Sequence, residues 1–334
     1  MDLDKFARKI QNYLQNNPLV VLGSGSSVPF GLPTMGFLST ILKDTQFLRD
    51  NNCQQFLKNL DCMGLEDAIN CSELSDEIKE LIRIEIWNCI NEADLNVFQS
   101  LLRENQLNSL IILIKKLIEP SPNRIVAITT NYDRLFEYAC DYCNVTVDNG
   151  FDGCFYKHFY GFSHEYDCKR LLGKKRLAKV LKVHGSLDWF VKNNSNELIS
   201  VAHCREIPKG YKPLIVPPGR DKYSQTHMEP YRGIITEADK QFNNAECFLC
   251  IGYGFNDEHI QPKLLEQIHQ NKPIVVITKE ATESCKNLII NSTIKKYIIV
   301  EQKDTNYTHV FCDFNEEFDI EGNYWSLDNF MEVW

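Results

Sequence analysis

The sequence has no long hydrophobic run and no nucleotide-binding loop of the P-loop type. None of its apolar stretches approaches the roughly 20 residues that a helix needs to cross a bilayer, so no membrane association is expected. The motif GxxxxGK[ST] is absent, and an ATPase activity would therefore belong to a separate chain or to a missing part. The chain also lacks internal repeats and low-complexity tracts. These absences favour a globular protein of 334 residues with a large core.

Basic residues are in deficit, and the cysteines lack a pairing pattern. Lys and Arg number 36 against 45 Asp and Glu, and the net charge of −9 argues against broad binding of nucleic acid. Any link with nucleic acid is expected to be indirect. The 13 cysteines are scattered and odd in number, and the start of the chain has the pattern of an amphipathic helix rather than of a secretion signal. We therefore expect free thiols and a cytoplasmic location.

The two CxxC pairs do not predict a metal site. Cys140 and Cys143 fall in a predicted helix, and Cys247 and Cys250 fall in a predicted buried strand. Residues of a strand point alternately to opposite faces, so the second pair cannot easily share one ion. We expect no zinc and no other metal.

Short apolar runs separated by helical patterns predict the fold class. The runs expected to form buried strands are 19–22, 125–129, 180–183, 213–216, 247–251, 274–277 and 297–300. Strands that alternate with helices are typical of a Rossmann-like α/β fold, with a mostly parallel sheet and helices on both faces. Residues 1–334 are expected to form one such domain.

Two insertions are expected in this domain. Residues from about 37 to 118 have an almost wholly helical pattern, which predicts a helical lobe beside the sheet. Residues from about 144 to 178 are rich in aromatic and basic side chains without clear periodicity. The aromatic residues there are either a lid over a ligand or part of the core. Residues 192–212 are polar and predict a loop.

The stretch 19–35, LVVLGSGSSVPFGLPTM, is the first candidate ligand site. Gly23 and Gly25 allow a sharp turn after a strand, and the serines around them leave small side chains and free amide hydrogens. A strand, such a turn and then a helix form a phosphate cradle. The third glycine of GxGxxG is missing, with Val28 in its place, so a plain glycine turn remains an alternative.

Polar motifs follow three further predicted strands. They are Thr130-Asn131-Tyr132-Asp133, His184-Gly185-Ser186 and the run from Gly252 to Asp257. Ligands of open α/β sheets bind at the carboxyl ends of the strands, so these residues are expected to converge. An asparagine can orient water without titrating, and a histidine can accept a proton near neutral pH. Alternatively, Asn131 or Asp133 caps the following helix, and His184 is structural.

Together with Gly31-Leu32-Pro33, these ordered motifs resemble the sirtuin family. The resemblance is closer to the Sir2-like domains of bacterial anti-phage defence proteins, with their GLPT, TTNYD and HGSLDW motifs, and it covers about residues 18–36 and 120–280. It implies a Rossmann-like fold that binds NAD⁺ as a substrate. It further implies an oligomer, or a HerA-type ATPase or other trigger protein as partner.

The resemblance also implies a role for individual residues. Asn131 would hold the nicotinamide ribose and a water molecule, Asp133 would anchor the carboxamide, and His184 would be the general base. The implied NAD⁺ contacts are Gly23, Ser24, Gly25 and Ser26 at the pyrophosphate, Gly252, Tyr253 and Asn256 at the adenosine half, and in addition Pro33, Thr130 and Tyr132.

Two departures from the sirtuin pattern point to hydrolysis of NAD⁺. Sirtuin deacylases carry two CxxC pairs after the HGS motif, whereas here a single cysteine, Cys204, lies between that motif and the next predicted strand. The sirtuin motif GIPDFR is GLPTMG here, without its acid and its arginine. We therefore expect an NAD⁺ glycohydrolase that releases nicotinamide and ADP-ribose and depletes NAD in defence. The alternatives are a zinc-free NAD-dependent protein deacylase or ADP-ribosyltransferase, and a module that senses NAD or another nucleotide without turnover.

Overall fold

A nine-stranded sheet forms the centre of the molecule. The computed structural model describes residues 3–51, 53–104, 107–119, 124–162, 176–219 and 228–334. The strand order is β14-β13-β12-β11-β10-β1-β2-β6-β3, and neighbouring strands from β12 to β3 are all parallel. The strands are β1 (Leu19–Leu22), β2 (Arg124–Thr129), β3 (Thr146–Asp148), β6 (Leu177–Lys182), β10 (Phe248–Ile251), β11 (Ile274–Ile277), β12 (Tyr297–Gln302), β13 (Tyr307–Cys312) and β14 (Glu316–Glu321).

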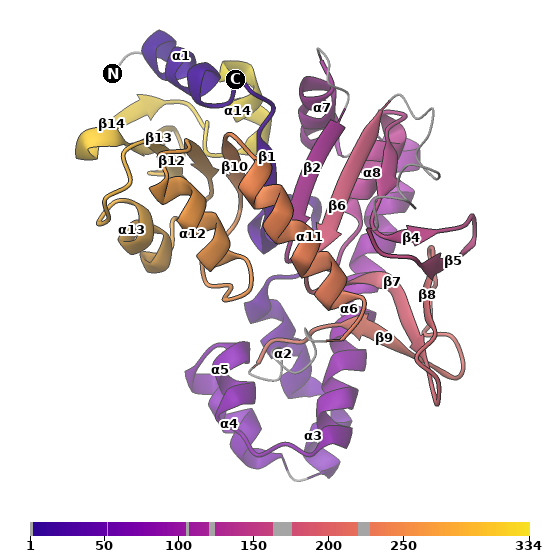
Figure 1. Cartoon of the computed structure of the whole chain (residues 1–334). Coiled ribbons are helices and arrows are strands. Elements are labelled where there is room, and N and C mark those ends of the chain that lie inside the picture. Colours follow the sequence, from indigo (N-terminus) through magenta and orange to yellow (C-terminus); the bar gives the residue numbers. More distant parts are fainter. Residues whose placement is uncertain (1–2, 52, 105–106, 120–123, 163–175, 220–227) are drawn as a thin grey trace.

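Helices cover both faces of this sheet, which confirms the predicted fold class. Along β1, Val20 and Leu22 enter one hydrophobic cluster while Leu19 and Val21 enter the other, as the alternation of a strand requires. The first face carries α1 (Leu3–Tyr13), α7 (Asn108–Leu117), α8 (Leu135–Tyr142) and α14 (Leu327–Val333). The second carries α11 (Tyr231–Asn244), α12 (Gln261–His269) and α13 (Glu283–Ile289), which lie in front of the sheet in Figure 1.

A group of helices, here called the lobe, lies between β1 and β2 in the chain. It consists of α2 (Met35–Asp44), α3 (Gln46–Asp50), α4 (Gln54–Cys62), α5 (Leu65–Asn70) and the long α6 (Asp76–Glu104). Figure 1 shows α2 to α5 below the carboxyl ends of the parallel strands. The Thr34 hydroxyl caps α2 by accepting the N–H of Phe37 at 3.2 Å. The helical pattern over 37–118 is thus observed, although α7 packs on the sheet against α8 and α14.

A second, antiparallel sheet has the order β4-β5-β8-β7-β9 and was not predicted. Its strands are β4 (Phe151–Asp152), β5 (Tyr156–Phe159), β7 (Gly185–Lys192), β8 (Leu198–Val201) and β9 (Tyr211–Ile215). The prediction of a loop over 192–212 was therefore wrong, because β8 and the start of β9 lie there. The prediction that the strands end at residue 300 was also wrong, since β13 and β14 form an antiparallel edge of the main sheet.

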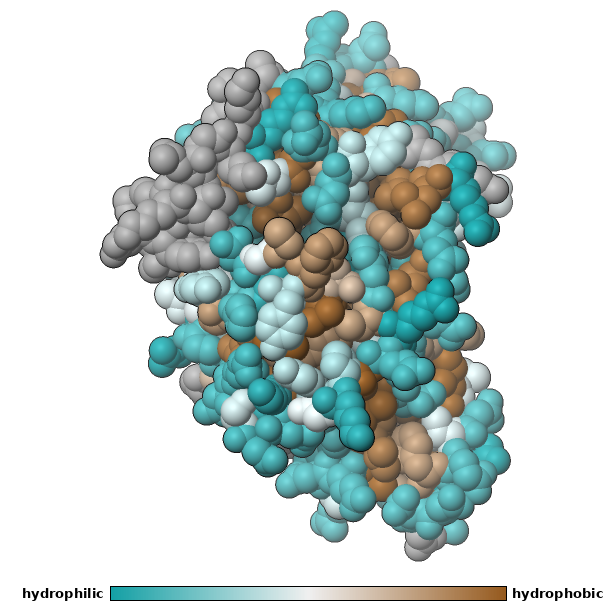
Figure 2. Space-filling view, turned by 90° about the vertical axis from the view of Figure 1, so that its right-hand side faces the viewer, coloured by the Kyte–Doolittle hydropathy of each residue, from teal (hydrophilic) through white to brown (hydrophobic). Residues whose placement is uncertain are grey.

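The aromatic and basic insertion is described only in part, because residues 163–175 lie outside the described residues. Phe151 is buried and packs on Trp189 with ring centroids 4.9 Å apart, whereas Phe155 is 88% exposed. Figure 2 views the side of the second sheet, where hydrophobic residues lie in separate patches among hydrophilic ones. None of the described helices is long and apolar enough to span a membrane.

Three glycines allow two backbone bends to touch. The bend after β1 (23–27) and the bend after β10 (252–257) lie against one another, and the N–H of Gly25 donates to the carbonyl of Gly252 at 3.1 Å. A Cβ on Gly23 would lie 2.4 Å from the Gly252 oxygen, and one on Gly252 would lie 2.2 Å from the Ser26 nitrogen. Gly252 also has a φ of +57°. These glycines serve a contact within the chain, in addition to any approach of a ligand.

The variant Gly252→Ala is expected to unfold at lower denaturant concentration, with a loss of about 2 kcal/mol or more. Both the left-handed backbone and the clash with Ser26 oppose a methyl group there. Gly36→Ala is the matched control, because a Cβ on this helical glycine meets only the Thr34 hydroxyl at 3.9 Å. The control should be as stable as the parent or up to about 1 kcal/mol more stable. Equal losses in the two variants would contradict the contact between the bends.

Candidate functional site

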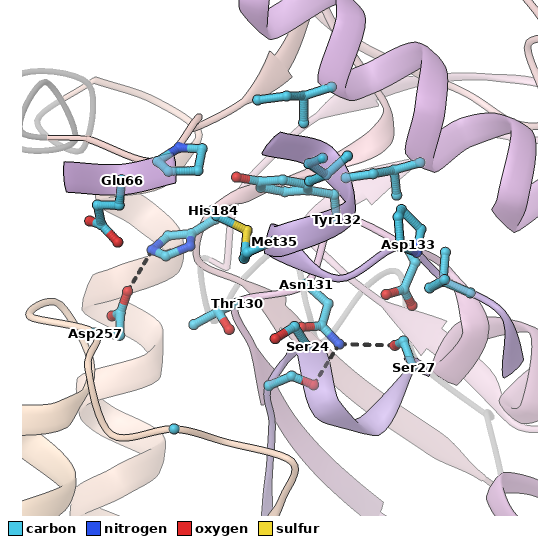
Figure 3. Close-up of a pocket in the computed structure, with 18 of the residues that line it drawn as sticks. Ser24, Ser27, Met35, Glu66, Thr130, Asn131, Tyr132, Asp133, His184 and Asp257 are labelled. Carbon is cyan, nitrogen blue, oxygen red and sulfur yellow. Dashed lines mark hydrogen bonds and ion pairs between the residues drawn. The ribbon is translucent and has the colours of Figure 1, made fainter. Parts of the chain in front are cut away.

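A pocket of about 250 Å³ lies between the carboxyl ends of the parallel strands and the lobe. The sheet side is polar, and the lobe side is largely apolar. The sheet side is formed by Gly23, Ser24, Ser27, Thr130, Asn131, Tyr132, Asp133, His184, Tyr253, Gly254, Asn256 and Asp257. Leu32, Pro33, Met35, Leu38, Glu66, Ile86, Ile90 and Pro218 form the rest. The strand-end motifs therefore meet in one pocket, as the sequence predicts (Figure 3).

Asn131 is fixed by the serine bend. Its Nδ2 lies 3.0 Å from the carbonyl of Gly23, 3.2 Å from the hydroxyl of Ser26 and 3.1 Å from that of Ser27. Its backbone N–H donates to the hydroxyl of Thr129 at 3.0 Å. Since these contacts use Nδ2, the amide oxygen Oδ1 remains the acceptor that Asn131 offers to the pocket. The side chain of Asn131 contacts the serine bend and does not cap the following helix.

The predicted free amides of the serine bend are largely occupied, which corrects the prediction of a cradle made of backbone N–H groups. The N–H groups of Gly23, Gly25, Ser26 and Ser27 donate to the carbonyls of Ile251, Gly252, Gly23 and Ser24, at 3.0–3.1 Å. The bend forms short 3₁₀ turns, Ser24–Ser26 and Val28–Phe30, rather than an open loop. The hydroxyl of Ser27 is also engaged, because it accepts from Nδ2 of Asn131 and donates to the carboxyl of Asp133.

Asp133 sits on a buried ionic cluster. Burial raises the pKa of its carboxyl, and the nearby ammonium group of Lys182 opposes that rise. Lys182 is fully buried, donates to the Asp133 carbonyl and lies 3.1 Å from Oε1 of Glu137. Burial likewise raises the pKa of Glu137. The Asp133 carboxyl also accepts the N–H of Leu135 at 3.3 Å, so the predicted alternative of a helix-capping contact is present for this residue.

His184 follows β6 and faces Asp257 across the pocket wall. Its Nε2 lies 2.8 Å from Oδ2 of Asp257, and each side chain is 8% exposed (Figure 3). The contact is close but is not aligned as a hydrogen bond. Burial by itself would raise the pKa of Asp257, but the contact with His184 and its charge outweigh burial, and the pKa is lowered.

The loop that carries Asn131 is anchored to α6. Arg134 donates to Asp94 through its backbone N–H at 2.7 Å and through Nη2 at 2.6 Å, and both side chains are buried. The hydroxyl of Tyr138 donates to the same carboxylate at 2.5 Å. The Tyr132 hydroxyl donates to the carbonyl of Val216 at 2.5 Å. These contacts hold residues 130–134 between the lobe and the second sheet.

Some predicted site residues lie behind the pocket, and some pocket residues were missed. Gly25, Ser26 and Gly252 do not line it, but they shape the bends that support Asn131. Asp257 and Glu66 line it and were not predicted. Asp257 could have been predicted from the sequence, because it is a carboxylate shortly after a predicted strand, as Asp133 is. Glu66 could not, because the lobe that carries it is placed only by tertiary packing.

Within the described part of the chain, the buried hydroxyl of Tyr253 finds no hydrogen-bond partner, and a ligand in the pocket would satisfy it.

No group of three or more His, Cys, Asp or Glu side chains among the described residues could hold a metal ion. Cys140, Cys143, Cys247 and Cys250 are buried and free.

Comparison with known proteins gives a family match over the region that carries most of these residues. Residues 125–282 match the SIR2-like domain. This SIR2-like region contains Asn131, Asp133, His184 and Asp257, while the serine bend and the lobe precede it. No curated protein matches the chain.

Several solved structures are similar to the chain. A Sir2 homologue in complex with NAD has a TM-score of 0.46 and 16% identity, over 90% of this chain and 88% of the other. A mutant Sir2 homologue with ADP-ribose has a TM-score of 0.46 and 16% identity, over 85% and 88%. Sir2Tm with a propionylated peptide has a TM-score of 0.41 and 16% identity, over 83% and 87%. At these values the likeness says nothing of what this chain binds.

The buried cluster beneath the pocket predicts a large effect of Lys182→Ala on stability. The substitution leaves Glu137 buried without its cation, and we expect a loss of about 3–5 kcal/mol in the free energy of unfolding. Lys192→Ala is the control, since Lys192 is 50% exposed and lies 3.3 Å from Glu197. It should lose less than about 1 kcal/mol in urea unfolding. Similar losses would show that Lys182 is not an essential counter-charge.

The pair of Asp257 and His184 predicts a component of acid unfolding. The folded pKa of Asp257 lies below its unfolded value of about 3.9, so the pair stabilises the fold above that pH. The contribution is lost as the pH falls from about 4 through the folded value. Asp257→Asn should therefore show a shallower fall in stability between pH 5 and 2 than the parent, measured by urea unfolding at each pH. Parallel curves would contradict the assignment.

Proposed function

We propose that the chain hydrolyses the bond between nicotinamide and ribose in NAD⁺ and releases nicotinamide and ADP-ribose. The observation that carries the proposal is the meeting of Asn131 and His184 in one pocket beside the serine bend. These two residue types supply what the reaction needs, an acceptor that orients a nucleophile and a group that takes its proton. The match of residues 125–282 to the SIR2-like domain supports an NAD-utilising site.

The two walls of the pocket suit the two parts of the substrate. Met35, Ile86 and Ile90 give the lobe side an apolar surface that accepts a flat aromatic ring such as nicotinamide. Ser24 lies on the sheet side, where its hydroxyl would donate to the pyrophosphate. The orphan hydroxyl of Tyr253 would gain a partner on the adenosine side.

The chemistry balances with water as the only co-reactant. The bond between C1′ of the ribose and the ring nitrogen breaks, and its electron pair leaves with neutral nicotinamide. The water oxygen forms a bond to C1′, and one water proton passes to His184 and then to solvent. Oδ1 of Asn131 positions the water or a ribose hydroxyl. The carboxylates on the pocket wall favour the positive charge that builds on the ribose.

Hydrolysis is favoured over acyl transfer by the residues at 31–36. The acid and the arginine of the sirtuin motif are replaced here by Thr34 and Gly36, and Pro33 and Met35 face the pocket instead. The motif resemblance to defence domains supports a role in NAD depletion, in an oligomer or with a HerA-type ATPase as trigger. Such a trigger would appear as faster nicotinamide release at higher protein concentration or with the ATPase added.

Release of nicotinamide from NAD⁺ by the purified chain tests the proposal. His184→Ala is expected to lower the rate by about 100-fold or more, because a general base contributes that much. Asn131→Ala should lower it by about 100-fold through misplacement of the nucleophile. His158→Ala, an exposed histidine on β5 outside the pocket, is the control and should retain full activity.

An acetylated peptide separates the alternatives in the same assay. The rate of nicotinamide release should be the same with and without the peptide. Release that requires the peptide would identify a deacylase. Saturable NAD⁺ binding without release, at high protein concentration and with candidate partners present, would identify a sensing module.

A further inference from the structure

We infer that Asp257 is the positioning residue of His184, which it holds in one orientation and one tautomer with Nδ1 presented to the pocket. The catalytic part of this inference rests on the proposed hydrolysis. The pairing itself does not, since it concerns two side chains of this chain at 2.8 Å.

The two oxygens of Asp257 have separate partners. Oδ1 accepts the backbone N–H groups of His259 and Ile260, each at 3.1 Å, where the chain enters α12. Oδ2 faces Nε2 of His184. The backbone contacts fix the plane of the carboxylate, so Oδ2 is a fixed point against which the imidazole is oriented. One oxygen of the carboxylate thus serves the backbone while the other faces the ring.

The tautomer follows from the charge of Asp257. The lowered pKa keeps this carboxyl ionised, and an ionised carboxylate only accepts hydrogen bonds. Nε2, the ring nitrogen beside it, must therefore carry the hydrogen when the imidazole is neutral. Nδ1 is then unprotonated, and Figure 3 shows that nitrogen on the side of the ring that faces the pocket. Nδ1 of His184 is therefore the nitrogen that can accept a proton from a substrate in the pocket.

Other groups face His184 from each neighbouring element. The ring of His259 meets it edge-on with centroids 5.8 Å apart. Glu66 of α5 and Tyr132 of the loop after β2 line the same pocket. Nε2 of His184 lies 2.8 Å from Oδ2 of Asp257, and we assign the orientation of the ring to this contact. During hydrolysis Nδ1 takes the water proton, and the carboxylate stabilises the resulting imidazolium.

The variant Asp257→Asn tests the inference. It keeps an oxygen for the backbone donors and removes the charge that dictates the tautomer. We expect kcat to fall at least tenfold with KM changed less than threefold, because the substrate contacts remain. Asp44→Asn, an exposed carboxylate at the end of α2, is the control and should leave both unchanged. Thermal unfolding of both variants checks the fold.

Nitrogen NMR of the histidine-labelled chain gives a readout that does not need turnover. The chain has eight histidines, and His184→Gln identifies the signal of interest by its loss. Above the titration range, the parent should show His184 with the hydrogen on Nε2, and Asp257→Asn should show a mixture of tautomers. A hydrogen on Nδ1 in the parent, or the same tautomer in both proteins, would overturn the inference. If the parent releases no nicotinamide, the proposed function fails while the NMR result still decides the pairing.

Discussion

The pocket depends on two backbone bends, far apart in the sequence, that touch without side chains between them. Gly23 and Gly25 after β1 lie against Gly252 after β10, at separations that no Cβ would permit. Because β1 and β10 are neighbours in the sheet, this contact brings the serine bend and the bend with Asp257 to one place. Asn131 then attaches the loop after β2 to the same bend through Nδ2. The backbone contact between the two bends therefore sets the geometry of the site, and the side-chain contacts of Asn131 add to it.

Charge is arranged in two layers around this backbone frame. Asp257 and His184 form the layer that faces the pocket. Lys182 and Glu137 form a second layer behind the loop, fully or largely removed from water. Buried charges must be paired, and the rear layer meets this need while the front layer lines the pocket.

The parallel sheet and the convergence of the motifs could be predicted from the sequence, because both follow from local patterns. Runs such as Leu19–Leu22 are wholly apolar and end in glycine turns, and parallel strands place such ends at one edge. The second sheet could not be predicted, since a strand such as Tyr156–Phe159 is polar and aromatic and is defined only by pairing with distant segments. The sequence also could not predict that the backbone N–H groups of the serine bend are occupied, because their acceptors include Ile251 and Gly252, far along the chain.

Helix α6 connects the outer part of the lobe to the loop that carries Asn131. It runs unbroken for 29 residues, a length of about 44 Å. Its middle supplies Ile86 and Ile90 to the pocket, and Asp94 further along holds Arg134. One helix therefore carries part of the apolar wall and also holds the asparagine loop, so a displacement of α6 would move both together.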